Sequence, residues 1–292
     1  MSKVARRLAS CVGRSSLVAA HTARPFSSLA QAENGQSAQV PRVENVELER
    51  FEMDYMKAEQ PVVLTQAIDH WPALRLWADL DHLRRRATTD AAEPSDEVVV
   101  PIEQGSTYLD PEMEHRHVSF TSYLDNLEKA ERGTDTASTG GRSQGAAVGY
   151  LAQFRLFDAI PSLQQDFEIP AFCRLGRGDY YGTHAWLGPQ GTVSPLHKDP
   201  YHNCLAQVVG SKYIRIYHPR HQACLYPFAD FTRKNSSQVD AENPNLDYYP
   251  RFADAPYLEC VLGAGQMLYI PKGHWHYVRS LSRSFSISFW WQ

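Results

Sequence analysis

The C-terminal half of the chain is a series of short segments of strand character, and this series limits the fold more than any other feature. Each segment is β-branched or alternates apolar with polar residues, and glycine or proline separates one segment from the next. In the last segment the alternation is strict, with Phe285, Ile287 and Phe289 on one face and serines on the other. Many short strands at this spacing predict a β-sandwich or a jelly-roll barrel. The segments are THAWLGPQG (183–191), NCLAQVVGSKYIRIYHP (203–219), APYLECVLGAGQMLYIP (255–271), HWHYVRSL (274–281) and SFSISFWW (284–291).

Helical patterns and isolated strands precede this region, so the predicted fold class is mainly β with flanking helices (α+β). A Gly/Ser/Thr-rich stretch over 134–149 predicts a flexible loop within the domain, because the strands that follow it need partners. We therefore expect one domain over 43–292, in which residues 43–133 support a jelly-roll core over 150–292. The predicted helices are 43–56, 70–87 and 119–133, the strands are 61–66 and 98–108, and 90–97 is an acidic turn.

The first 32 residues differ in composition from the rest of the chain. They contain five basic residues and no acidic one, and they are rich in serine and alanine. This composition is typical of a mitochondrial transit peptide, which forms a basic amphipathic helix; the alternative is a basic tail without a targeting role. The mostly polar residues 33–42 predict a tether. The sequence thus favours a mitochondrial protein over a cytoplasmic or nuclear one.

Charge, hydropathy and cysteine spacing restrict the classes of partner. The formal net charge is −4, and without residues 1–32 it becomes −9, from 24 basic and 33 acidic residues. This balance gives no indication of nucleic-acid binding and mildly favours a basic partner. No segment approaches 18 consecutive apolar residues, so no membrane span is predicted. The five cysteines form no CxxC pair, which predicts reduced thiols of an intracellular protein. No feature of the sequence fixes an oligomeric state.

The stretch SPLHKDPYHN (194–203) contains a candidate metal-binding pair. His197 and Asp199 are two residues apart, so in a strand both side chains face the same side. A third ligand from a distant strand would complete a two-histidine, one-carboxylate triad, the usual holder of non-haem Fe(II) in oxygenases. His274 and His276 are both candidates, and spacing does not choose between them. The alternatives are a buried hydrogen-bonded pair at a strand end and a hydrolytic zinc site.

Two long stretches of this sequence resemble the Jumonji-C domain of the 2-oxoglutarate oxygenases. The resemblance is dense from about Tyr150 to Trp291, in stretches such as AWLGPQGTVSPLHKDPYHN (185–203) and GAGQMLYIPKGHWHYVRSLSRSFSISFWW (263–291). It is looser in QPVVLTQAIDHWPALRLW (60–77) and VVVPIEQGSTYLD (98–110). It implies a double-stranded β-helix, a jelly roll of the cupin type, that uses Fe(II), 2-oxoglutarate and O2. It assigns the iron ligands to His197, Asp199 and His276 and leaves His274 outside the ligand set.

The resemblance also implies a co-substrate pocket and a substrate pocket. Lys212 matches the lysine that pairs with the distal carboxylate of 2-oxoglutarate. A lysine that points into a barrel needs a counter-anion, because burial alone would depress its pKa. Tyr150, Ser194 and Asn203 match hydrogen-bonding positions of the same co-substrate. Trp186 and Trp290 match aromatic positions that line the substrate pocket; the alternative for both is core packing. Glu103 matches an acidic residue suited to a guanidinium; the alternative is a solvated carboxylate.

The resemblance implies hydroxylation of a protein or peptide side chain, with arginine as the leading candidate. Two tryptophans and a carboxylate suit a planar cation, which can stack and form bidentate hydrogen bonds. The first alternative is removal of an N-methyl group from lysine or arginine by the same site. The second is a cupin-like protein that binds a ligand without turnover. The complete set of ligands and the lysine favour an enzyme over such a binding protein.

Overall fold

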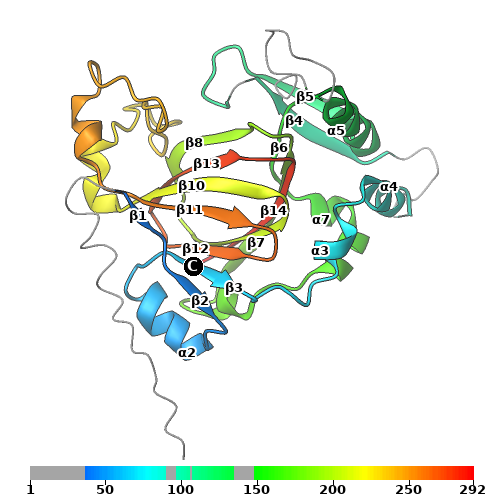
Figure 1. The fold of residues 1–292 in the computed structure, drawn as a ribbon, viewed down its shortest axis with the longest axis horizontal. Coiled ribbons are helices and arrows are strands. Elements are labelled where there is room, and N and C mark those ends of the chain that lie inside the picture. Colours follow the sequence, from blue (N-terminus) through cyan, green and yellow to red (C-terminus); the bar gives the residue numbers. More distant parts are fainter. Residues whose placement is uncertain (1–36, 90–96, 106, 135–147) are drawn as a thin grey trace, which may run out of the picture.

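The computed structural model describes residues 37–89, 97–105, 107–134 and 148–292 (Figure 1). The predicted transit peptide over 1–32, most of the acidic turn and most of the loop over 134–149 lie outside the described residues, as does the first part of the tether. Among the described residues, no helix is long and apolar enough to cross a membrane.

Two sheets that face each other form the centre of the molecule (Figure 1). One has five strands in the order β1-β11-β10-β13-β8, and the other has seven in the order β2-β3-β12-β9-β14-β7-β6. The strands β7 to β14 pair antiparallel and pass back and forth between the two sheets, so the predicted jelly roll is confirmed. These strands are Tyr180–Gly188, Val193–Lys198, His202–Val209, Ser211–Tyr217, Leu258–Gly263, Met267–Ile270, Trp275–Ser280 and Ser284–Trp291.

The tight connection between β9 and β10 depends on Gly210. Its φ is +73°, and a Cβ atom there would lie 2.0 Å from the carbonyl oxygen of Arg283. Only glycine fits both the left-handed conformation and the close approach of the neighbouring backbone. The turn moves the chain from the seven-stranded sheet to the five-stranded sheet and brings Lys212 into the roll two residues later.

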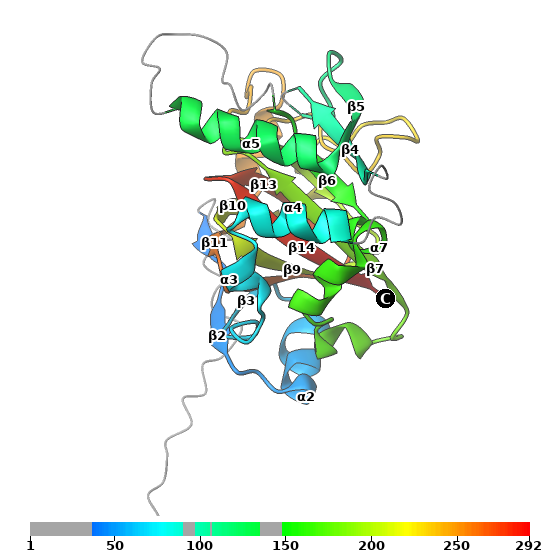
Figure 2. The same ribbon diagram turned by 90° about the vertical axis from the view of Figure 1, so that its right-hand side faces the viewer.

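The N-terminal part of the domain extends both sheets and covers one of them with helices (Figure 2). β1 pairs parallel with β11, and β2 pairs parallel with β3. The helix predicted over 43–56 begins later, because residues 42–44 are strand β2; α2 then continues into a π-helical segment. The helix predicted over 70–87 is two helices, α3 and α4, with a break at Trp77. The bounds are β1 Ala38–Gln39, β2 Arg42–Glu44, α2 Leu48–Phe51, η1 Glu52–Met56, β3 Val62–Thr65, α3 Ala73–Leu76 and α4 Leu80–Thr89.

A two-stranded hairpin and a long helix complete this half. β4 (Val99–Gln104) pairs with β5 (Glu114–Ser119), and α5 (Phe120–Thr134) follows directly. β4 and α5 agree with the predicted strand and helix, whereas β5 was not predicted. An isolated bridge between Glu103 and Tyr150 joins the hairpin to the roll just before β6. Four short elements lie around this point and before β7: β6 Leu151–Phe154, α7 Leu156–Ala159, η2 Pro161–Asp166 and η3 Ala171–Arg174.

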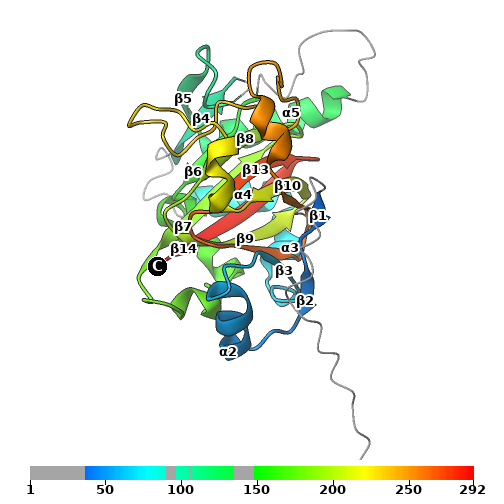
Figure 3. The same cartoon turned by 90° about the vertical axis from the view of Figure 1, so that its left-hand side faces the viewer.

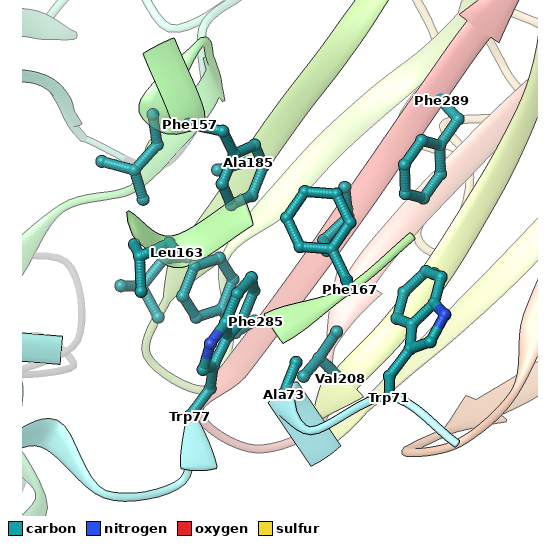
Figure 4. Packing of buried hydrophobic residues seen from close by; sticks show 14 of the residues in the cluster. Trp71, Ala73, Trp77, Phe157, Leu163, Phe167, Ala185, Val208, Phe285 and Phe289 are labelled. Carbon is teal, nitrogen blue, oxygen red and sulfur yellow. The ribbon is translucent and has the colours of Figure 1, made fainter. Parts of the chain in front are cut away.

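Strand β14 is buried on both faces. Phe285, Ile287 and Phe289 belong to the core between the seven-stranded sheet and the covering helices. Figure 4 shows Trp77 against Phe285 in this core, with ring centroids 4.5 Å apart. The alternating serines are buried too, on the opposite face, where Ser288 lines a pocket inside the roll. The predicted alternation is therefore present, but its polar face looks into the roll and not into solvent.

A long insertion between β10 and β11 covers the outer face of the five-stranded sheet (Figure 3). It contains the short helices η4 (Pro219–Cys224) and η5 (Pro250–Asp254). Leu225, Val239 and Phe252 from the insertion pack on Trp275 and Tyr277 of β13. The insertion thus contributes to a separate hydrophobic cluster, and it lies next to strand β8.

One buried carboxylate, Asp166 of η2, holds η2 against the α3–α4 segment, and its removal will destabilise the fold. Asp166 accepts hydrogen bonds from Trp77 Nε1 at 2.9 Å and Arg86 Nη2 at 3.2 Å, and contacts His82 Nε2 at 3.1 Å. Asp166→Ala leaves these donors unpaired, so we expect the free energy of unfolding to fall by about 2–4 kcal/mol. Chemical denaturation measures the change. Asp158→Ala, which removes an exposed ion pair with Arg155, is the control and should change the value by less than about 1 kcal/mol; equal losses in the two variants would refute the structural role of Asp166.

Candidate active site

The register of β8 and β13 brings two of the predicted ligands together. His197 and His276 are directly opposite each other across the two strands, with ring centroids 4.3 Å apart. Asp199 follows β8 by one residue, and its Oδ2 lies 3.7 Å from Nε2 of His276. One ligand atom from each of the three side chains lies within 4.8 Å of the other two, which is the spacing of a metal site.

Backbone carbonyls orient both imidazoles. Nδ1 of His197 lies 2.6 Å from the carbonyl oxygen of Pro195, and Nδ1 of His276 lies 3.1 Å from that of His274. Each Nδ1–H therefore donates to a carbonyl, which leaves Nε2 free to bind a metal. Burial, together with the neighbouring His197, lowers the pKa of His276 to about 4. The ring is thus neutral near pH 7, as metal ligation requires.

His274, the other candidate for the third ligand, faces away from this site. It precedes β13, and its ring packs against His218 with centroids 5.0 Å apart. It lines a small separate hollow together with His218 and Tyr257. The geometry thus separates two histidines that the spacing alone left equivalent.

A pocket inside the roll is lined by the three candidate metal ligands and a buried lysine. Lys212 on β10 is only 1% exposed, and its Nζ donates a 3.0 Å hydrogen bond to the hydroxyl of Tyr150. No carboxylate of the described residues pairs with it, and burial lowers its pKa to about 7. The predicted co-substrate residues line the same pocket: Tyr150, Ser194, Asn203 and Lys212.

The donors of this pocket fit an acidic co-substrate next to a metal. Tyr150 is hydrogen-bonded to Ser194 as well as to Lys212, so both hydroxyls are held at the wall. Oδ1 of Asn203 is buried without a hydrogen-bond partner among the described residues. An anion beside Lys212 would restore the full charge of the ammonium, because it would offset the cost of burial. The residues present therefore fit Fe(II) and the dicarboxylate 2-oxoglutarate.

The structure separates the predicted substrate residues from one another. Trp186 lines the inner pocket, donates from Nε1 to Ser288 Oγ at 2.8 Å and has its ring centroid 6.0 Å from Nζ of Lys212. Trp290 lies opposite Asn203 in the neighbouring strand and packs against His184 with the two rings tilted by 40°. Trp186 is thus beside the co-substrate residues, whereas Trp290 is nearer the mouth of the roll.

Glu103 lies in a second, larger cleft of about 670 Å³ between the β4–β5 hairpin, β8 and the insertion. Tyr150 lines both this cleft and the inner pocket, so the two spaces adjoin. Burial raises the pKa of Glu103 to about 7, and no described residue forms a hydrogen bond or an ion pair with its carboxylate. Glu103 is therefore a partly buried carboxylate that no described residue pairs with, in a cleft that adjoins the pocket of the candidate metal ligands.

Tyr108 was not predicted. Its ring lies edge-on to His197 at 6.4 Å between centroids, and its hydroxyl is 3.1 Å from Ser236 Oγ in the insertion. It therefore joins the hairpin to the insertion next to the metal-binding residues. A tyrosine in a loop carries no sequence signal of such a position. Ser288, which was also missed as a pocket residue, could have been found from the serine face of the last strand.

The jelly roll, the His-Asp-His cluster at its mouth and the buried lysine together define a cupin-type fold with a candidate metal site. A family model described as the cupin-like domain matches residues 48–292. The chain belongs to this family, and its relatives include a protein named for the Jumonji C domain. The family resemblance predicted from the sequence motifs is confirmed.

Relatives in the family have named activities. The chain is 44% identical to lysine-specific demethylase 8 of Danio rerio over 87% of this chain and 58% of that protein. It is 38% identical to Jumonji C domain-containing protein 5 of Drosophila melanogaster over 87% and 60%. It is 28% identical to the bifunctional peptidase and (3S)-lysyl hydroxylase JMJD7 of Homo sapiens over 82% and 80%. The chain spans a little over half the length of the first two.

Proposed function

We propose that this protein hydroxylates a basic side chain of a protein substrate, with arginine as the leading candidate. The observation that supports the substrate class is the partly buried carboxylate of Glu103, which no described residue pairs with, in the cleft that adjoins the inner pocket. His197, Asp199 and His276 would hold Fe(II), and Lys212, Tyr150, Ser194 and Asn203 would hold 2-oxoglutarate. Iron and 2-oxoglutarate supply the oxidising power taken from O2. The chain supplies facial ligand geometry, a fixed anion site and a partly enclosed pocket.

Arginine suits Glu103 better than a methylated lysine does. A guanidinium presents several N–H donors in one plane and can form two parallel hydrogen bonds with a carboxylate. A fully methylated ammonium has no N–H donor, so it would leave the carboxylate without hydrogen bonds. Lysine with one or two methyl groups keeps an N–H donor, but of these cations only the planar guanidinium pairs with a carboxylate through two parallel hydrogen bonds.

Demethylation of N-methyl-lysine is the second candidate, because several relatives are named as lysine-specific demethylases. Mass spectrometry of peptide products separates the two reactions. Peptides with arginine, lysine or methyl-lysine at one central position are incubated with the 33–292 fragment, Fe(II), ascorbate and 2-oxoglutarate. A gain of one oxygen on the arginine peptide supports the proposal. Loss of a methylene from the methyl-lysine peptide, with arginine unmodified, supports demethylation. Binding of 2-oxoglutarate without any product would support a cupin that binds and does not turn over.

Glu103→Gln will weaken turnover of the arginine peptide and remove part of its pH dependence. The amide keeps the size but loses the charge, so kcat/KM should fall about 10- to 100-fold. The wild-type carboxylate titrates near pH 7 and is negative above it. Turnover by the wild type should therefore rise between pH 6 and 8, and the variant should lose this increase. Steady-state kinetics measures both effects. Affinity for 2-oxoglutarate should stay unchanged, and a wild-type kcat/KM in the variant would remove Glu103 from the substrate site.

A further inference from the structure

Four aromatic rings form a continuous wall at the mouth of the roll. Tyr181 and Tyr201 are stacked with centroids 4.3 Å apart, and Tyr201 is stacked on Trp290 at 5.8 Å and 16° between planes. His184 lies 4.6 Å from Trp290 and 6.2 Å from Tyr181. We call these four residues the aromatic wall. They come from β7, β14 and the β8–β9 connection, so the fold and not one local motif assembles them.

The aromatic wall continues the lining of the inner pocket. On β7, His184 is two residues from Trp186, and on β14, Trp290 is two residues from Ser288; both of these neighbours line the pocket. Side chains two residues apart in a strand share a face. Tyr201 is two residues after Asp199 in the chain. The wall therefore begins beside the metal-binding residues and leads out of the roll.

Exposure increases along the wall from the inside outward. His184 and Trp290 are 6% and 4% exposed, whereas Tyr181 is 54% exposed. Nε1 of Trp290 and Nδ1 of His184 are buried, and no described residue gives either atom a hydrogen bond. A buried indole N–H normally has an acceptor. The indole N–H needs an acceptor, such as a peptide carbonyl, and Nδ1 of a neutral His184 can accept from an N–H donor. These unused polar atoms, on rings nine-tenths buried, therefore indicate a peptide ligand that carries both acceptors and donors.

The chemistry of the wall selects a planar cation. Its rings present π faces, which attract a guanidinium most strongly when it lies flat against them. Within the described part of the chain, no lysine or arginine lies over Tyr181, Tyr201 or Trp290. The nearby Arg155 is neutralised by Asp158 at 2.7 Å. The outer rings are therefore a stacking surface that the protein's own described cations leave uncovered.

We propose that Tyr181 and Tyr201, supported by Trp290 and His184, bind a second arginine of the substrate, at a position flanking the residue that reacts. This inference rests on the proposed function and adds a sequence preference to it. Glu103 and the aromatic wall reach the inner pocket through different residues of its lining: Glu103 is bridged to Tyr150 beside the hairpin cleft, and Trp290 of the wall pairs with Asn203. A peptide that crosses the mouth places one basic side chain near Glu103 and a neighbouring one on the wall.

Peptide binding without turnover tests the wall. The probes are short peptides with a central arginine and a second arginine scanned through the flanking positions, each matched to a peptide with citrulline at the flank. Citrulline keeps the planar shape and loses the charge. Calorimetry on protein loaded with Fe(II) and 2-oxoglutarate, without O2, gives the Kd. For the wild type, citrulline at one flanking position should weaken binding about five- to tenfold. For Tyr201→Ala and Tyr181→Ala, the same exchange should change Kd less than about twofold.

The matched variants Tyr201→Phe and Tyr181→Phe keep the ring and should keep the preference for arginine. The inference is overturned if no flanking position distinguishes arginine from citrulline in the wild type, or if the alanine variants keep the full preference. The proposed function fails in a different way, namely if no peptide with a central arginine gains oxygen when O2 is admitted. Because Kd is measured without turnover, each outcome can occur without the other.

Discussion

Asp199→Ala and His197→Ala will each reduce iron-dependent succinate formation from 2-oxoglutarate to background. Each substitution removes one of three protein ligands whose donor atoms lie within 4.8 Å of one another. Loss of a residue that only supports a ligand already costs about 10- to 100-fold in metal affinity or activity, so the loss of a ligand should exceed about 100-fold. Succinate release by the 33–292 fragment with Fe(II) and ascorbate measures the effect, and calorimetric titration with Fe(II) under anaerobic conditions measures the loss of metal binding independently.

His70→Ala is the matched control for these variants, because His70 is an exposed histidine outside the roll. It should leave both succinate release and metal affinity unchanged. Substantial activity in Asp199→Ala or His197→Ala would falsify the metal site described here. If both variants retain iron but lose activity, the two residues support the site without ligating the metal.

Lys212→Met will nearly abolish binding of 2-oxoglutarate and, at the same time, stabilise the empty protein. Methionine fills a similar volume without a charge, so the co-substrate loses its buried counter-ion. Loss of one partner of a buried charge pair costs about 2–5 kcal/mol, which is roughly 30-fold to several thousand-fold in Kd. Calorimetry gives the Kd of 2-oxoglutarate, and denaturation gives stability. Lys129→Met on the exposed face of α5 is the control and should change neither.

The stabilising effect of Lys212→Met should depend on pH in a defined direction. Burial lowers the pKa of Lys212 from 10.5 to about 7 in the folded protein without co-substrate. Between these values the unfolded chain binds more protons than the folded chain, so the free energy of unfolding rises with pH. The advantage of the methionine variant should therefore be largest below pH 7 and shrink as pH rises toward 10. A pH-independent difference, or one that grows with pH, would show that the lysine is not held in a desolvated site.

The sequence predicts most of the fold because its strongest signals are local. In 183–291, alternation with period two and regular glycine and proline define each strand, and all of these strands appear. The hairpin strand β5 lacks such a signal, because EHRHVS is largely exposed and polar. The spacing of apolar residues also does not predict the break between α3 and α4. It occurs at Trp77, where packing against Phe157 and Phe285 determines the path of the chain.

The site is less predictable than the fold because it depends on distances between strands. His274 and His276 are two residues apart, so strand alternation alone would place them on the same face. Which of them joins the site depends on β13 beginning at Trp275 and on the pairing of His276 with His197. The family resemblance assigned His276, and the geometry explains the assignment. Tyr108 and the aromatic wall depend on contacts between segments far apart in sequence. No pattern within one segment could have revealed them.

Strand β14 lies between the hydrophobic core under the helices and the interior of the roll. This position determines how well the strand tolerates substitutions. Its phenylalanines and isoleucine belong to the core; on the opposite face Ser288 lines the pocket of the predicted co-substrate residues, and Ser284 and Ser286 are hydrogen-bonded to Gln207. A slip of one residue in its pairing would place the aromatic rings in the interior of the roll and the hydroxyls in the core. A single register therefore maintains both the fold and the chemistry. Neither face of the strand tolerates random substitution. Variants of β14 should therefore tend to lose activity and stability together.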